Sequence, residues 1–219
     1  MGGLLRWLFG APCHGCGEAL AVGVAAPFCD VCASAAEPVL GWSQLQLGAA
    51  ELPVATGWSY GGAVAAAVQR IKFGGAQPDL EGLVAGLHQR LRQRAEGGEL
   101  LLLPIPPQPQ RLRQRGFHLP DRLASALARG HGPWQVRRLL RRVDLNPPRT
   151  LRPDLQPRFL ARPAQAAPPI WLVDDVLTTG TTLRLACDAL LARGWGVAGA
   201  ICLCDARNGR EGRHGALSN

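Results

Sequence analysis

The segment covering residues 170–195, IWLVDDVLTTGTTLRLACDALLARGW, constrains the fold more than any other part of the chain. Four apolar residues lead directly into Asp174 and Asp175, and a stretch rich in Thr and Gly then precedes a helical pattern of apolar residues. A short apolar run bounded by turn residues is typical of a buried strand, and the apolar repeat after it is typical of an amphipathic helix. We therefore predict a strand at 170–173, a loop, and a helix at 182–192.

The rest of the chain alternates strand-like and helix-like segments. Further strands are expected at 99–105, 134–143 and 196–206, and helices at 62–72, 80–94 and 120–128. Loops are expected at 111–119 and 146–169, and a linker at 33–53. Strands that alternate with helices predict an α/β protein with a parallel, doubly wound sheet.

Two Cys-x-x-Cys pairs, with twelve residues between them, predict a metal site near the start of the chain. The four residues are Cys13, Cys16, Cys29 and Cys32. In a reducing compartment such pairs are typical of metal ligands rather than disulfides, and four sulfurs make the closed tetrahedron of a structural zinc site. Gly15 and Gly17 allow the backbone to curl so that its amides face the thiolates, and His14 is a spare ligand. The remaining cysteines, which lie in apolar patterns and are expected in the core, are Cys187, Cys202 and Cys204.

Basic residues are concentrated in one part of the chain. The formal net charge is +8, yet the stretch 111–162 has thirteen arginines and three acidic residues, a local charge of +10. Such a cluster predicts an anionic partner such as phosphate, pyrophosphate or nucleic acid, although an Arg-rich solvated surface has the same composition. Of the 24 basic residues only Lys72 is a lysine. It marks either a position that needs a compact ammonium group or chance.

The Asp pair and the loop after it predict a ligand site. Ligands of open parallel sheets bind beyond the carboxyl ends of the strands, where Asp174 and Asp175 stand. The next loop opens a helix, and helix-start amides with hydroxyl donors favour a phosphate. Its residues are Thr178, Thr179, Gly180, Thr181 and Thr182. Carboxylates would repel that phosphate but suit sugar hydroxyls or a metal, so the combination predicts a ribose 5-phosphate site.

The alternatives for this segment are a P-loop, a dinucleotide-binding loop and a structural turn without a ligand. The sequence of a P-loop requires a lysine that this segment lacks, and the glycine fingerprint of dinucleotide-binding folds is absent. The structural alternative is a helix cap beside a solvated turn, in which the Asp residues have no ligand.

These motifs resemble those of the ComF family, bacterial proteins of natural competence with a type I phosphoribosyltransferase fold. The resemblance rests on IWLVDDVLTTGTT, the four-cysteine module, YGGAVAAAVQRIKFGG and PIPPQPQRLRQRGF. It implies that Asp174 and Asp175 are catalytic and bind the ribose hydroxyls of phosphoribosyl pyrophosphate (PRPP), that the loop 178–182 holds its 5-phosphate, and that Mg²⁺ accompanies it. Lys72 is then expected near the mouth of the site. Candidates for contact with pyrophosphate or DNA are Arg111, Arg113 and Arg115.

Two departures from the family pattern affect the acceptor side of the expected site. The family commonly has Arg-Gly-Phe-Asn-Gln where this chain has RGFHL, with His118 at the fourth position. The family's Thr-x-x-Gln stretch survives only in fragments, within NPPRTLRPDLQPRFLARP.

Three functions therefore stay open. The first is a phosphoribosyltransferase with an unknown acceptor, and the second is a non-catalytic sensor or single-stranded DNA-binding module of the DNA-uptake machinery. The third is an adaptor for a competence helicase. Base stacking needs aromatic side chains near the basic stretch, and the candidates are Phe117, Trp134 and Phe159. The other tryptophans considered, which are expected to pack in the core, are Trp42, Trp58, Trp171 and Trp195.

The expected organisation is a small N-terminal module and a larger domain. The module with its linker covers 1–52, the phosphoribosyltransferase-like domain 53–210 and a tail 211–219. No apolar run approaches the roughly 20 residues that span a bilayer, so we expect a cytoplasmic protein without membrane insertion.

Overall fold

The computed structural model describes residues 10–23, 26–73, 80–95, 98–129, 133–143, 158–164 and 167–207, except for the side chains of Arg111 and Arg115. In chain order its elements are α2 (Asp30–Ser34), β1 (Trp42–Leu47), β2 (Ala50–Ser59), α3 (Gly62–Phe73), α4 (Glu81–Ala95), β3 (Leu100–Pro104), α5 (Pro109–Arg115), α6 (Leu119–Ala128), β4 (Trp134–Val136), β5 (Leu140–Val143), β6 (Arg158–Ala161), β7 (Ile170–Leu177), α7 (Thr181–Leu191) and β8 (Val197–Asp205). The expected tail at 211–219 and the first part of the loop expected at 146–169 lie outside the described residues. In the described part of the chain, no helix is both long and apolar enough to cross a bilayer.

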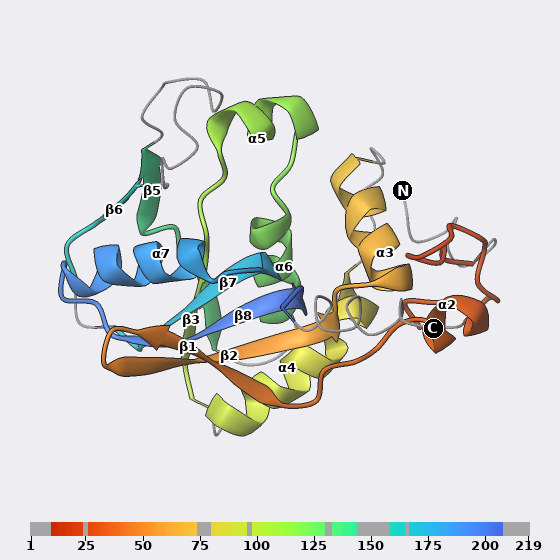
Figure 1. The fold of residues 1–219 in the computed structure, drawn as a ribbon, viewed down its shortest axis with the longest axis horizontal. Coiled ribbons are helices and arrows are strands. Elements are labelled where there is room, and N and C mark those ends of the chain that lie inside the picture. The colour runs from red at the N-terminus through yellow and green to blue at the C-terminus, as the bar shows by residue number, and fades with distance from the viewer. Residues whose placement is uncertain are drawn as a thin grey trace, which may run out of the picture.

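The described elements form a six-stranded central sheet (Figure 1). Its order is β1-β2-β8-β7-β3-β4, in which β2, β8, β7, β3 and β4 run parallel and β1 pairs antiparallel with β2. A separate antiparallel pair is formed by β5 and β6. The predicted α/β class with a mostly parallel sheet is confirmed.

Apolar residues of the sheet alternate between two cores. On β3, Leu102 belongs to the core shared with α3, α4 and α6, whereas Leu101 and Leu103 belong to the core shared with α7, β5 and β6. Figure 1 shows α4 and α7 on opposite sides of the sheet. Because both faces are covered, the central strands are almost continuously apolar, which is the usual condition of parallel sheets.

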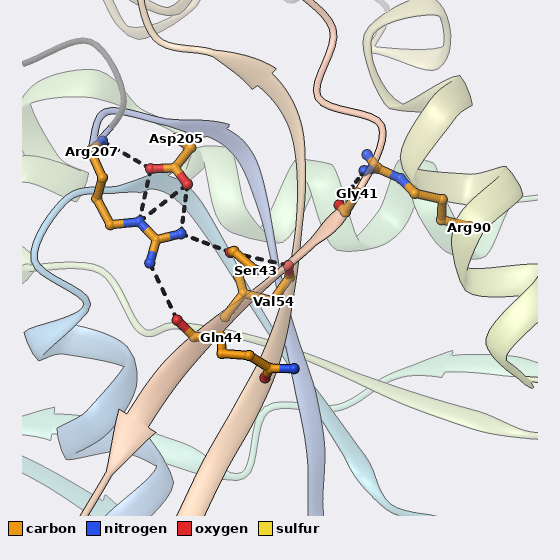
Figure 2. Close-up of polar contacts among 7 residues, drawn as sticks. All are labelled: Gly41, Ser43, Gln44, Val54, Arg90, Asp205 and Arg207. Carbon is orange, nitrogen blue, oxygen red and sulfur yellow. Dashed lines mark hydrogen bonds and ion pairs between the residues drawn. The ribbon is translucent and has the colours of Figure 1, made fainter. Parts of the chain in front are cut away.

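The stretch 33–53, expected to be a linker, contains an edge strand. All of β1 and the start of β2 lie within it, and a boundary between residues 52 and 53 would cut β2. The start of the hairpin is held by Arg90 of α4, whose Nη1 donates to the Gly41 carbonyl at 2.9 Å (Figure 2). The expectation of a linker was wrong here because β1 has one side on the core and one in solvent, so its sequence, WSQLQL, lacks a continuous apolar run.

Four other expected boundaries are corrected. The loop expected at 111–119 contains most of α5, which begins with Pro109 at a position where proline needs no amide partner and is followed by Gly116 with φ of 71°. The strand expected at 134–143 is two strands, β4 and β5, which belong to different sheets. The loop expected at 146–169 contains β6, and β7 continues past residue 173 to Leu177.

The four-cysteine region packs against α3. A Cβ atom on Gly15 would approach Cys32 Sγ to 2.7 Å and the Ala63 side chain to 3.2 Å. Gly17 has φ of 88°, and a side chain there would collide with the Arg70 guanidinium. Gly15 is thus favoured by close packing, and Gly17 by its positive φ. Ala63 and Arg70, which lie beside these two turns, both belong to α3, the helix that carries Lys72.

Candidate functional site

A cavity of about 330 Å³ lies at the carboxyl ends of β3 and β7. Its lining consists of Lys72, residues 105–108, Leu112, residues 117–120, Arg142, residues 174–176, Thr178 and Thr182. The lining thus comes from α3, α5, α6, α7, β5, β7 and the loop after β3. The cavity is where the strand-end rule for parallel sheets places a ligand.

Both predicted aspartates face this cavity, but they do so from inside a strand. β7 extends to Leu177, so Asp174 and Asp175 occupy its fifth and sixth positions. The Oδ2 atom of Asp175 lies 2.7 Å from the Nζ atom of Lys72 on α3. The Oδ1 atom of Asp174 accepts a hydrogen bond of 2.9 Å from the Asp175 amide.

The Asp174 carboxyl resists ionisation. Burial raises its pKa to about 7, and the negative charge of Asp175 adds to the shift. The hydrogen bond from the Asp175 amide and the positive charges of Lys72 and Arg142 oppose the shift only in part. A group with this pKa is poised to gain or lose a proton when a cation or a hydroxyl donor enters the cavity.

Only part of the Thr and Gly loop reaches the cavity. Thr178 and Thr182 line it, whereas the hydroxyls of Thr179 and Thr181 bond to each other at 2.9 Å. Gly180 has φ of 73°, and a Cβ atom there would collide with the Leu45 side chain of β1. Its missing side chain therefore makes room for β1 rather than for a ligand, and the phosphate-binding role of its backbone amide stays a prediction.

The described basic residues of the cavity agree with the expectation only in part. Lys72 lines it, in agreement with the expectation that the lone lysine lies at the site. Arg113 is exposed and does not line it, and the side chains of Arg111 and Arg115 lie outside the described residues. Arg142 of β5 lines the cavity instead. It was missed because nothing in an Arg-rich stretch distinguishes one arginine from its neighbours.

The cavity is also lined by a histidine whose only signal in the sequence was a departure from the ComF pattern. His118 lines the cavity, and its Nδ1 atom lies 2.8 Å from Asp121 Oδ2. Asp121 also accepts from Arg138, at 2.8 Å from Nε and 2.7 Å from Nη2. Burial opposes ionisation of Asp121, but the hydrogen bonds and charges of His118 and Arg138 outweigh it and lower its pKa. The i,i+3 spacing at a helix start is the one sequence signal that could have indicated this pair.

Two of the three candidate stacking aromatics are unavailable. Trp134 packs against His88 with 4.9 Å between ring centroids, and Phe159 is buried under α7. Phe117 lines the cavity. The four tryptophans expected to pack do so: Trp171 and Trp195 are buried, and Trp42 and Trp58 pack partly buried against the core.

The N-terminal cysteines form a cluster that could hold a metal ion. The Sγ atoms of Cys13, Cys16, Cys29 and Cys32 all lie within 4.8 Å of one another. The Cys29 amide donates to Cys13 Sγ at 3.3 Å. Burial opposes the Cys13 thiolate, but this amide and those of Cys16 and Gly15 outweigh it and lower the pKa of Cys13 to about 6. Four convergent sulfurs with amide donors fit a structural Zn²⁺ ion. The other three cysteines, Cys187, Cys202 and Cys204, are buried as expected.

Comparison with known proteins gives one match to a domain family. Residues 170–215 match the model of a phosphoribosyl transferase domain. Within the described residues, the match covers β7, α7 and β8, and so includes the Asp pair and the loop that follows it. None of the curated proteins compared with the chain matches it. The site segment of this chain is therefore similar to that of phosphoribosyl transferases.

Proposed function

We propose that the cavity binds PRPP and that the protein is a phosphoribosyltransferase. The observation that carries the proposal is the position of Asp174 and Asp175, side by side on β7, in a cavity that also holds Lys72. The phosphoribosyl transferase domain match covers these two aspartates.

Each wall of the cavity fits one part of PRPP. The carboxylates of Asp174 and Asp175 accept hydrogen bonds from the ribose hydroxyls. An ionised phosphate has no such donors to offer a carboxylate. The hydroxyls of Thr178 and Thr182 at the start of α7 donate to the 5-phosphate, together with the helix amides. Lys72 and Arg142 attract the pyrophosphate, and Lys72 exchanges its present partner, Asp175, for it.

Catalysis in such a cavity consists of positioning and charge stabilisation. Loss of pyrophosphate from C1 of the ribose leaves a positively charged, oxocarbenium-like ring, which the ionised Asp pair stabilises. The oxygen-rich wall of β7 fits Mg²⁺, which would enter with PRPP and neutralise the pyrophosphate. Because the pKa of Asp174 is raised to about 7, part of the free protein carries a proton on this carboxyl at neutral pH, and binding of PRPP with Mg²⁺ would release it.

We propose zinc as the resident metal of the cysteine cluster. Its role is to hold the two Cys-x-x-Cys turns against α3, because a site closed by four sulfurs has no free position for a substrate. Metal analysis should find one zinc per chain, lost in Cys16→Ser and kept in Cys187→Ala, which changes a cysteine outside the cluster. Zinc kept by Cys16→Ser would contradict this assignment.

We further propose that the protein acts in the use of DNA taken up during competence. This proposal rests on the resemblance of its motifs to those of the ComF family. A non-catalytic protein that binds single-stranded DNA is the second candidate. The exposed arginines Arg141 and Arg158 on the β5–β6 pair favour it, but the burial of Trp134 and Phe159 removes two of its three stacking residues. Such binding would weaken steeply with salt.

The decisive experiment is calorimetric titration of PRPP with Mg²⁺ into the purified protein. We expect binding in the micromolar range, weakened about 100-fold or more in Asp175→Asn because an amide cannot replace a charged acceptor for two hydroxyls. The matched control is Asp188→Asn, which removes the same charge from an exposed position on α7. Absence of binding to the folded wild-type protein would leave the DNA-binding candidate in first place.

A further inference from the structure

His118 is an ionisable side chain of the cavity that the proposed PRPP site leaves without a role. It lines the same cavity as the Asp pair, and its chain neighbours Phe117 and Leu119 line it too. Its side chain is 15% exposed, so it is largely removed from solvent yet reachable. As the residue before α6 it has extended backbone, with φ of −125°, but its side chain does not cap the helix. The side chain instead contacts the carboxylate of Asp121.

That contact determines which nitrogen of the ring is available. Nδ1 is bonded to the Asp121 carboxylate at 2.8 Å, and the lowered pKa of Asp121 keeps that carboxylate ionised at neutral pH. A carboxylate only accepts hydrogen bonds, so the neutral ring carries its proton on Nδ1 and keeps the lone pair on Nε2. Among the described residues, Nε2 has no protein partner.

Charged groups surround this pair on several sides. Asp121 lies on α6, which starts directly after His118, and is itself paired with Arg138, which is largely exposed. The same cavity is lined by Lys72 of α3, Arg142 of β5 and the Asp pair of β7. An imidazole held by a carboxylate, in the cavity proposed to bind an electrophilic sugar, has the arrangement of a general base.

We propose that His118 removes the proton from the acceptor nucleophile and that Asp121 positions it. The inference rests on the proposed function, since it needs PRPP in the cavity. In the step, a nitrogen or oxygen of the acceptor forms a bond to C1 of the ribose, and the bond from C1 to the pyrophosphate oxygen breaks. Pyrophosphate leaves with the bonding electron pair, and the proton of the acceptor passes to Nε2 of His118.

The acceptor is therefore a molecule with an N–H or O–H group that must lose its proton during attack. The walls around His118 select its shape: Phe117, Leu112 and Pro107 offer apolar contact to a flat or hydrophobic group. These three apolar residues offer no favourable contact to a charged group of the acceptor.

Pyrophosphate release from PRPP and Mg²⁺, with water as the acceptor, tests the base without knowledge of the natural acceptor. His118→Asn should lower the rate about 100-fold, the lower end of what a general base contributes, and leave the PRPP dissociation constant within about twofold. Asn is a favourable residue before a helix, so this variant should fold. Added imidazole should restore the rate of His118→Ala, and Asp121→Asn should lower the rate about tenfold. Ser125→Ala, which removes a hydroxyl that bonds the Asp121 carbonyl on the same helix, is the control and should change nothing.

Two results overturn the inference independently of each other. One is an equal rate of pyrophosphate release in wild type and His118→Asn, measured on protein that binds PRPP. Absence of pyrophosphate release above background from both proteins counts as the same result. The other comes from ¹⁵N spectra of the ring without any ligand: a neutral His118 with its proton on Nε2 could not act as the base. Failure of the wild-type protein to bind PRPP removes the proposed function itself and, with it, this step.

Discussion

The ends of β7 and β8 lie side by side, and both carry aspartates, yet the two sites have opposite character. Leu177 of β7 is the register partner of Asp205 of β8. Asp205 is 2% exposed, and Arg207 satisfies it with Nη2 at 2.7 Å, Nε at 3.0 and 3.1 Å and its own amide at 2.9 Å (Figure 2). Within the described residues, the Asp174 and Asp175 pair receives a hydrogen bond from a backbone amide and an ion pair from the Lys72 ammonium group.

The difference shows how the same side chain is fully paired at one strand end and keeps free acceptor capacity at the next. Arg207 also donates to the Ser43 hydroxyl and the Gln44 carbonyl, so the Asp205 site ties β8 to β1 and leaves no bonding capacity for a ligand (Figure 2). The β7 site keeps unused acceptor capacity at the wall of a cavity. Substitutions at the two sites should therefore separate stability from binding.

The largest effect on stability is expected from Asp205→Asn. An amide leaves the Arg207 guanidinium without its charged partner, and we expect the free energy of unfolding to fall by about 2 kcal/mol, discounted for the partial exposure of Arg207. PRPP affinity should stay within about twofold. Denaturant unfolding and calorimetry measure the two quantities, and a loss of binding without loss of stability would break the comparison.

Asp174→Asn should act in the opposite direction on stability. The pKa of the Asp174 carboxyl in the wild-type protein is raised in the folded state. The neutral carboxyl therefore contributes stability that is fully present below the unfolded pKa of about 4 and is lost as pH rises through about 7. The variant should therefore be more stable than wild type at pH 8, by about 1–2 kcal/mol, and equal to it at pH 4. Urea unfolding at the two pH values checks this. Equal stability at pH 8 would place the ionised carboxyl in a better solvated environment.

The same titration should appear in ligand binding. If ribose hydroxyls bind the ionised pair, PRPP affinity falls as pH drops below about 7, by up to about tenfold at pH 6. Calorimetry in two buffers of different ionisation enthalpy should register proton release at pH 6.5. The control is Asp174→Asn, in which this release should disappear; release that persists would assign the proton to another group.

The smallest effect is expected at the lone lysine. Lys72→Arg keeps the charge but replaces a compact ammonium group by a planar fork in a confined cavity, and we expect about a fivefold loss of PRPP affinity. The free energy of unfolding should change by less than about 1 kcal/mol, as is usual for an ion pair that is not fully buried. Arg70→Lys, two residues earlier on α3 at an exposed position that does not line the cavity, is the matched control. Unchanged affinity in Lys72→Arg would indicate that its identity is chance.

Elements were predicted correctly where the residue pattern within one short segment was enough to identify them. The buried strand before Asp174, the helix after Gly180 and the cysteine spacing were all identified from neighbouring residues, because periodicity and ligand spacing are properties of a short segment. Edge strand β1 was missed because its stability depends on partners elsewhere in the chain, β2 and Arg90. Helix α5 was missed although its start at Pro109 and its end at Gly116 are local signals, because a short segment of mostly basic and polar residues has no apolar repeat.

What the sequence determined by itself is the α/β class, the cysteine cluster and the pair of carboxylates at the end of a parallel strand. Only the tertiary structure decided which charges meet them. Lys72 lies about a hundred residues before Asp175 in the chain, and Arg142 stands in a stretch of many arginines, yet both line one cavity. The reason is physical: a group's protonation state and partners depend on burial and on charges a few ångströms away, and folding alone sets those distances.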